Sequence, residues 1–209
     1  MKPIPIDRIR LYFEEKFAVH GPTPAGVDWN STAVQHNRFE QLVRICDPTR
    51  TFSINEFGCG YGALVDYLLQ RGWSFTYTGY DLVEASVSQA RLVYPNASHY
   101  SFTTRQEDLS ISDYTTASGI FNIKLDTSTQ DWTEFVLSKL HEMHILSRRG
   151  FSFNCLTSYS DLEFMRPHLY YADPGQMFDY CKRHFSKNVA LLHDYGLYDF
   201  TILVRKTLD

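Results

Sequence analysis

Three glycines alternate with larger residues in the stretch from Ile54 to Gly62, which reads INEFGCGYG. They follow a run of β-branched and aromatic residues and precede an apolar pattern with helical spacing, so they fall where a strand turns into a helix. Glycine permits positive φ at such a turn and lets a ligand approach the main chain, because it has no Cβ atom. Bare turns at a helix N-terminus are typical of nucleotide-binding sites.

Two carboxylates accompany this turn. Glu56 precedes the first glycine by two positions, giving E-x-G-x-G-x-G, and Asp81 ends the next predicted strand in YTGYD. A strand-end carboxylate can accept hydrogen bonds from both hydroxyls of a ribose. The dinucleotide pattern G-x-G-x-x-G wants its third glycine where this chain has Ala63. The spacing alone is weak evidence, and the two acids favour a nucleoside over a dinucleotide.

Candidate catalytic and substrate-binding residues come from the rule that ligands bind beyond the carboxyl ends of the strands in an open α/β sheet. A neutral imidazole can take a proton from a hydroxyl or an amine, so His193 is the candidate catalytic base, although a hydrogen-bonded histidine at a hairpin end explains it as well. Tyr171, in the loop before the last helix, either lines a substrate pocket or packs its own loop. The rule also selects polar residues after the later strands, namely Asn122, Asn154, Thr157, Asp194 and Tyr195.

No metal site is expected. His141 and His144 form H-x-x-H within an amphipathic helix, whereas zinc sites of this kind read H-E-x-x-H. The cysteines show no CxxC pair and no metal-ligand spacing, and we expect reduced thiols in a cytoplasmic protein. They are Cys46, Cys59, Cys155 and Cys181.

Composition and charge limit the function classes. The net charge is −4 and no run of five like charges occurs, which argues against a broad phosphate-binding face and so against nucleic acid. No apolar run approaches about 18 residues, and the first eight residues lack the apolar core of a signal peptide, so no membrane span is expected. Aromatic residues make up 15% of the chain, which suits a pocket for a flat or cationic ligand, and equally a generous core.

Strands and helices alternate along most of the sequence. This order predicts a mostly parallel sheet covered on both faces, to whose edge the final hairpin adds an antiparallel strand. Strands are predicted at residues 52–57, 75–80, 100–103, 114–118 and 151–156, and two more flank a turn near Tyr195 and Gly196. Helices are predicted at residues 7–19, 31–46, 63–70, 84–94, 132–146 and 174–185.

From Phe52 to the C-terminus the chain resembles the class I S-adenosylmethionine-dependent methyltransferases. The resemblance rests on Glu56, on the GCGxG stretch that follows it, on Asp81 and on the C-terminal hairpin. It implies a Rossmann-like α/β three-layer sandwich, with a mostly parallel seven-stranded sheet and an antiparallel C-terminal strand. It also implies two parts, an N-terminal helical cap over residues 1–48 and a cofactor-binding core over residues 49–209.

The resemblance assigns roles around S-adenosylmethionine. The methionine and ribose parts of the cofactor would lie along Gly58, Cys59, Gly60, Tyr61 and Gly62. Glu56 would orient the loop or meet the amino group, Asp81 would bind the ribose, and Leu82 would pack on the adenine. The segment RQEDL offers Gln106, Glu107 and Asp108 for the adenine amino group, without a choice among them.

Three further cofactor residues lie outside these motifs. Ser118 would border the methyl group. Arg38, on the second predicted helix, would pair with the cofactor carboxylate, because a guanidinium grips carboxylates bidentately. Trp29 would close over the pocket. A surface arginine and a packing tryptophan are equally consistent with the sequence.

The expected activity is methyl transfer from S-adenosylmethionine to an oxygen or nitrogen atom of a small-molecule acceptor. One alternative is a methyltransferase-like protein that binds the cofactor without turnover, and another is a nicotinamide-dependent oxidoreductase. The chain lacks the N/D-P-P-Y motif of amino-methylating DNA enzymes. These residues leave open the acceptor's identity and the oligomeric state.

Overall fold

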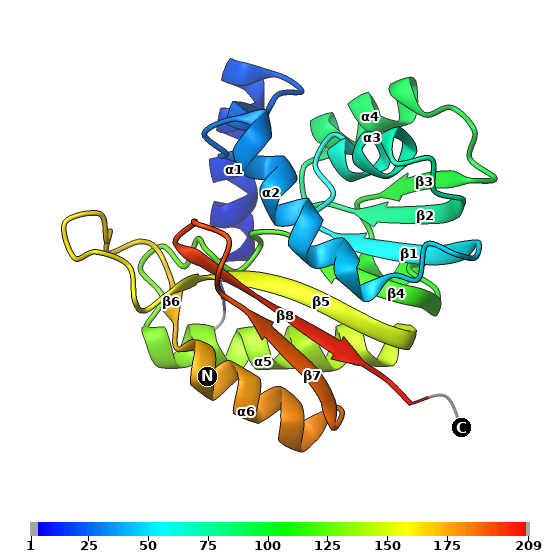
Figure 1. Ribbon diagram of the computed structural model, residues 1–209. Coiled ribbons are helices and arrows are strands. Elements are labelled where there is room, and N and C mark those ends of the chain that lie inside the picture. The colour runs from blue at the N-terminus through cyan, green and yellow to red at the C-terminus, as the bar shows by residue number, and fades with distance from the viewer. Residues whose placement is uncertain (1–3, 208–209) are drawn as a thin grey trace.

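Eight strands form one sheet in the computed structural model, which describes residues 4–207 (Figure 1). The strand order is β3-β2-β1-β4-β5-β8-β7, and the short β6 pairs with β5. Strands β1 to β6 pair in parallel, whereas β8 runs antiparallel to both of its neighbours. The strands are β1 Phe52–Phe57, β2 Phe75–Tyr80, β3 Tyr100–Thr103, β4 Ser112–Ala117, β5 Ser147–Thr157, β6 Tyr171–Ala172, β7 Asn188–Leu192 and β8 Asp199–Arg205.

Helices cover both faces of the sheet, with α2, α3 and α4 on one face and α5 and α6 on the other (Figure 1). Three of them begin at a side-chain cap, since Ser31, Ser128 and Asp173 each accept a hydrogen bond from a main-chain N–H in the first turn. The helices are α1 Ile6–His20, α2 Thr32–Leu42, α3 Ala63–Gln70, α4 Glu84–Val93, α5 Thr129–Ile145 and α6 Pro174–His184. Three short 3₁₀ turns are η1 Pro24–Val27, η2 Val43–Ile45 and η3 Gln106–Asp108.

The predicted fold class is confirmed, including the bounds of β1, β2 and β3. Two details were wrong: the sheet has an eighth strand, the two-residue β6, and the antiparallel strand β8 does not lie at the edge of the sheet but between β5 and β7. Burial explains the order, because six of the seven residues of β8 are buried, whereas β7 is half-buried or exposed throughout. The more apolar strand of the hairpin therefore takes the inner position.

The N-terminal segment is not isolated from the sheet. Phe39, Val43 and Ile45 belong to the same apolar cluster as β1 and α3, and Ile9 of α1 belongs to the cluster on the α5 face. The division into a cap over residues 1–48 and a core over residues 49–209 stays a prediction. Over residues 4–207, we find no helix that is both long and apolar enough to cross a membrane.

Candidate active site

The glycine turn after β1 needs glycine for two reasons. Gly58, Gly60 and Gly62 have φ of 74°, 52° and 87°, in the left-handed region that other residues rarely adopt. A Cβ atom would also collide with neighbours: at Gly58 it would lie 2.2 Å from Cγ2 of Ile120, and at Gly60 2.9 Å from Cγ1 of Val27. The bare main chain is thus closely covered by the loop after β4 and by the N-terminal segment.

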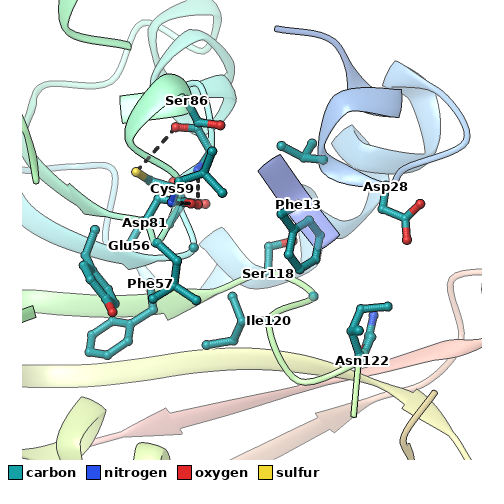
Figure 2. A pocket seen from close by; sticks show the side chains of 18 of the residues that line it. Phe13, Asp28, Glu56, Phe57, Cys59, Asp81, Ser86, Ser118, Ile120 and Asn122 are labelled. Atoms are coloured by element: carbon teal, nitrogen blue, oxygen red, sulfur yellow. Dashed lines mark hydrogen bonds between the residues drawn. The ribbon is translucent and has the colours of Figure 1, made fainter. Parts of the chain in front are cut away.

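Asp81 ties this turn to the end of β2. One carboxylate oxygen accepts a hydrogen bond from the main-chain N–H of Gly60 at 2.8 Å, and the other accepts one from Val83 at 2.8 Å. Burial raises the pKa of Asp81, and the hydrogen bonds from main-chain N–H groups partly oppose that rise. The carboxylate therefore fixes the backbone of the glycine turn, and it also lines the cavity in front of that turn (Figure 2).

Glu56 lies deeper, in β1, with only 2% of its surface exposed. The hydroxyl of Tyr77 donates a hydrogen bond to its carboxylate. Burial raises the pKa of Glu56 from 4.5 to about 8, the Tyr77 hydrogen bond lowers it, and the charge of Asp81 raises it further. The turn is therefore flanked by two acids whose ionised forms are disfavoured by burial, and a cation beside them would favour their ionisation.

A cavity of about 280 Å³ opens in front of this turn, at the carboxyl ends of β1, β2 and β4. Helix α1 and the segment after η1 close its other side, so that Phe13 and Asp28 face Ser118, Ile120 and Asn122 across it (Figure 2). Of the residues predicted from the sequence, those that line it are Trp29, Glu56, Gly58, Cys59, Gly60, Tyr61, Asp81, Leu82, Gln106, Ser118 and Asn122. Gly62 does not line it, because a Cβ there would meet the rings of Tyr94 and Phe102 instead.

The adenine side of the predicted site contains Leu82 and Gln106. The amide of Gln106 is held by α5, since Nε2 donates to Glu142 at 2.6 Å and Oε1 accepts from Lys139 at 2.8 Å. The alternative, Glu107, lies outside the cavity in an exposed ion pair with Arg105. Of the three candidates in RQEDL, the short turn η3 therefore directs only its first residue, Gln106, into the cavity.

The predicted catalytic base His193 is not in the cavity. It is exposed on the turn between β7 and β8, with its ring 5.9 Å from that of Tyr159. Because β7 is the edge strand, separated from β4 by β5 and β8, the turn that follows it does not reach the switch point of the sheet. The end of a strand is visible in the sequence, whereas the position of that strand in the sheet is not.

Two predicted substrate tyrosines and Asn154 are likewise engaged elsewhere. The hydroxyl of Tyr195 shares a 3.0 Å hydrogen bond with Thr201, and that of Tyr171 accepts one from the N–H of Arg166 at 2.9 Å. Asn154 accepts a hydrogen bond from the N–H of Gly119 at 2.7 Å, behind the cavity wall. Of the predicted substrate residues, Asn122 alone lines the cavity.

Arg38 also lies outside the cavity. Its side chain is 8% exposed and donates to the carboxylate of Asp199, the first residue of β8, and to the carbonyl of Val34. The guanidinium stacks over the ring of Trp29 at 4.1 Å. The predicted pairing of Arg38 with a cofactor carboxylate is therefore corrected to an internal ion pair.

Several cavity residues carry no sequence motif and were therefore not predicted. Asp28 has a positive φ of 64° and accepts hydrogen bonds from Tyr12 and Lys16 of α1, both at 2.7 Å. The buried ion-pair partner Asp199 was also missed, although a lone acid at the start of an apolar strand was a usable signal. The other missed cavity residues include Phe13, Val27, Gln35, Ile120 and Lys139.

The histidines of the H-x-x-H sequence face α6 rather than the cavity. His141 shares a 2.9 Å hydrogen bond with the hydroxyl of Tyr180, and His144 stacks on Phe185. In the part of the chain that the structure describes, no three His, Cys, Asp or Glu side chains gather as metal ligands would.

The comparisons with known proteins agree with this geometry. No family model matches the sequence. A curated protein of Mycobacterium tuberculosis, Rv1506c, whose name assigns it provisionally to the methyltransferases, is 51% identical over 166 residues, which are 79% of this chain and 98% of that protein. The chain therefore belongs to the same methyltransferase family.

Solved structures share the fold. The 1,6-didemethyltoxoflavin-N1-methyltransferase of Burkholderia thailandensis, with its substrate and S-adenosylhomocysteine bound, superposes with a TM-score of 0.64 at 17% identity, over 99% of this chain and 92% of that one. The N-methyltransferase NodS of Bradyrhizobium japonicum WM9, in complex with S-adenosylhomocysteine, gives a TM-score of 0.63 at 14% identity, over 94% and 97% of the two chains.

Proposed function

We propose that the protein transfers a methyl group from S-adenosylmethionine to an oxygen or nitrogen atom of a small-molecule acceptor. The observation that carries the proposal is the glycine turn, whose main chain is fixed by Asp81 and open to a cavity beside Glu56. A ribose needs a fixed strand-end carboxylate, and the ammonium group of an amino acid needs a negative charge nearby. Asp81 and Glu56 meet these two requirements beside the same glycine turn.

The residues present fit this cofactor. Asp81 would accept the ribose hydroxyls, Leu82 and Val83 would cover the adenine, and Gln106 would face its edge. Glu56 would balance the cofactor's positive charge, and Gly60 would let the ligand lie against the main chain. When bound, the sulfonium of the cofactor supplies a methyl group that is activated for attack by a nucleophile.

The cavity also supports a small acceptor. Apart from the two acids and Asn122, its walls are mainly apolar and aromatic, and α1 lies across it. Two charged side chains that line it already have partners, Asp28 with Lys16 and Lys139 with Glu142. Neither of these two side chains is free to take a proton from the acceptor. Alignment of the acceptor with the methyl group must therefore supply most of the rate enhancement. Alignment of donor and acceptor can supply about 7–11 kcal/mol, whereas a general base adds roughly 10²–10⁴-fold.

The same observation supports a second candidate, a protein that holds the cofactor without turnover. The two functions separate by whether S-adenosylhomocysteine accumulates when the protein is incubated with S-adenosylmethionine and a broad panel of hydroxyl and amine acceptors. The nicotinamide alternative has no further support, since the chain belongs to a methyltransferase family. A cytoplasmic location and the absence of nucleic-acid and membrane partners stay predictions from the sequence.

Calorimetry with S-adenosylmethionine and S-adenosylhomocysteine tests the cofactor site. Gly60→Val should abolish binding, because the side chain would meet Val27 and stand between ligand and main chain. The matched control is Gly72→Val, which has the same left-handed backbone, at φ 69°, and no atom within 4 Å of its Cβ position. Wild-type protein that binds neither ligand at millimolar concentration, or a Gly60 variant that binds like the Gly72 control, would refute the proposal.

A further inference from the structure

Four buried polar atoms near Trp29 find no hydrogen-bond partner among the described residues. They are Nε of Arg38, Oδ1 of Asp199, Nδ2 of Asn154 and Oγ of Ser118, and the fifth such atom in residues 4–207 is Nδ1 of His144, on α5. Buried polar atoms are nearly always paired, so four exceptions in one cluster require an explanation.

The contacts of these side chains form one continuous path. Asp199 holds Arg38, and the guanidinium of Arg38 stacks on the ring of Trp29 at 4.1 Å. The ring of Trp29 in turn covers Gly119, where a Cβ atom would lie 2.4 Å from it. Asn154 fixes the other side of that residue, by accepting the hydrogen bond from the N–H of Gly119.

Only one end of this path reaches the site. Trp29, Ser118 and Gly119 line the cavity, whereas Arg38 and Asp199 stand behind them. Gly119 itself is left-handed, with φ of 72°, and it is the second residue after β4, so its position decides where the cavity wall stands. The ion pair can therefore act on a ligand through the indole ring.

Stability does not account for the pair. Asp199 is 1% exposed and Arg38 6%, so both side chains are shielded from bulk solvent, and each keeps one polar atom without a partner among the described residues. Replacing such a pair with apolar side chains of similar volume is often neutral or stabilising, whereas a half-satisfied buried network is worse than an apolar core. A costly arrangement beside a site is better explained by what it holds in place.

We propose that Arg38, Asp199 and Asn154 are positioning residues, which hold Trp29 and the Ser118–Gly119 turn as the rigid wall against which the acceptor is aligned with the methyl group. This inference rests on the proposed function for its catalytic part. Arg38 and Asp199 do not line the cavity. They therefore act on a ligand only through the indole ring, whose orientation they fix.

The main test replaces the ion pair by apolar residues, in the double variant Arg38→Met with Asp199→Leu. Unfolding in urea should give a stability equal to or above that of the wild type. Fluorine NMR of protein labelled with fluorotryptophan, in which Trp29→Phe assigns one of the three resonances, should show the Trp29 signal shifted or broadened. The Kd of S-adenosylhomocysteine should stay within about threefold, and kcat for an accepted substrate should fall about 10- to 100-fold, as expected for lost alignment.

The control removes another buried polar pair, Thr116 with Ser152, whose hydroxyls share a 3.0 Å hydrogen bond inside the sheet. The variant Thr116→Val with Ser152→Ala should leave the Trp29 signal and kcat unchanged. Arg38→Lys separates the two contacts, because lysine keeps the charge beside Asp199 but loses the flat stack on Trp29. It should reproduce the loss in kcat, and it stands in for the double variant if that variant does not fold.

An unchanged Trp29 resonance in both Arg38 variants overturns the proposal, whatever the activity. So does a shifted resonance with kcat unchanged, because the wall would then move without consequence. Failure of the proposed function has a different signature: no acceptor would be methylated by the wild-type protein, while the NMR comparison would still report whether the pair holds the ring.

Discussion

Replacement of Glu56 by glutamine should separate the stability of the fold from cofactor binding. The glutamine carbonyl can accept the hydrogen bond from Tyr77 that the carboxylate accepts now. What disappears is the ionisable group. The substitution therefore removes a charge from a buried position without removing the contact that orients the side chain.

The magnitude follows from the pKa of Glu56, which burial raises from 4.5 to about 8. A carboxyl group whose pKa rises on folding stabilises the fold fully at pH values below its unfolded pKa, and this contribution is lost as the pH rises through the folded pKa. Between about pH 6 and pH 8 the loss is about 2 kcal/mol. For a chain of this size that corresponds to a Tm lower by roughly 4–8 °C.

The assay is thermal and urea unfolding of the ligand-free protein at a series of pH values from 6 to 9. Relative to Glu56→Gln, the wild type should lose about 2 kcal/mol of stability between pH 6 and pH 8, and the difference should level off above the folded pKa. Glu134→Gln, at an exposed position on α5, changes the net charge equally and should track the wild type. Parallel pH profiles for wild type and Glu56→Gln would refute the reasoning, because they would mean that folding does not raise the pKa of Glu56.

Three further predictions follow from the same geometry. A cationic cofactor requires ionised Glu56, so the affinity for S-adenosylmethionine should rise by up to about tenfold per pH unit below pH 8. Calorimetry in buffers of different ionisation enthalpy should then detect proton release on binding. An affinity that does not change with pH would contradict this prediction. Gly58→Ala should abolish cofactor binding in a calorimetric titration, since its Cβ would lie 2.2 Å from Ile120, whereas Gly72→Ala should bind normally. Burial raises the pKa of the Cys59 and Cys155 thiols well above the ordinary value and that of Cys181 to about 12, so a thiol reagent at pH 8 should label the native protein slowly and the urea-unfolded protein at once; rapid native labelling would show that these thiols are accessible.

Local patterns were sufficient wherever one stretch of chain decides its own structure. The strand Phe52–Phe57, the glycine turn and the helix Ala63–Gln70 were predicted with their observed bounds. The reason is that backbone conformation, apolar spacing and helix start are all set by residues within a few positions of each other. The position of Asp81 in the site was predicted for the same reason, because it directly follows the next strand.

Residues that act through partners far along the chain could not be placed in this way. Arg38 was expected to face a cofactor carboxylate, but Asp199, 161 positions away, holds it behind the wall. His193 was expected at the acceptor, but the order of β5, β8 and β7 puts its turn outside the cavity. Neither the pairing of two distant charges nor the order of two hairpin strands leaves a periodic pattern in the sequence.

The sequence by itself therefore determined the family, the strand–turn–helix unit and the two acids around it, because these depend on local backbone chemistry. The tertiary structure alone decided what surrounds that unit: Val27 and Ile120 packed on the glycines, α1 across the cavity, and a buried ion pair behind Trp29. These features depend on burial, and burial is defined only once distant segments have packed together.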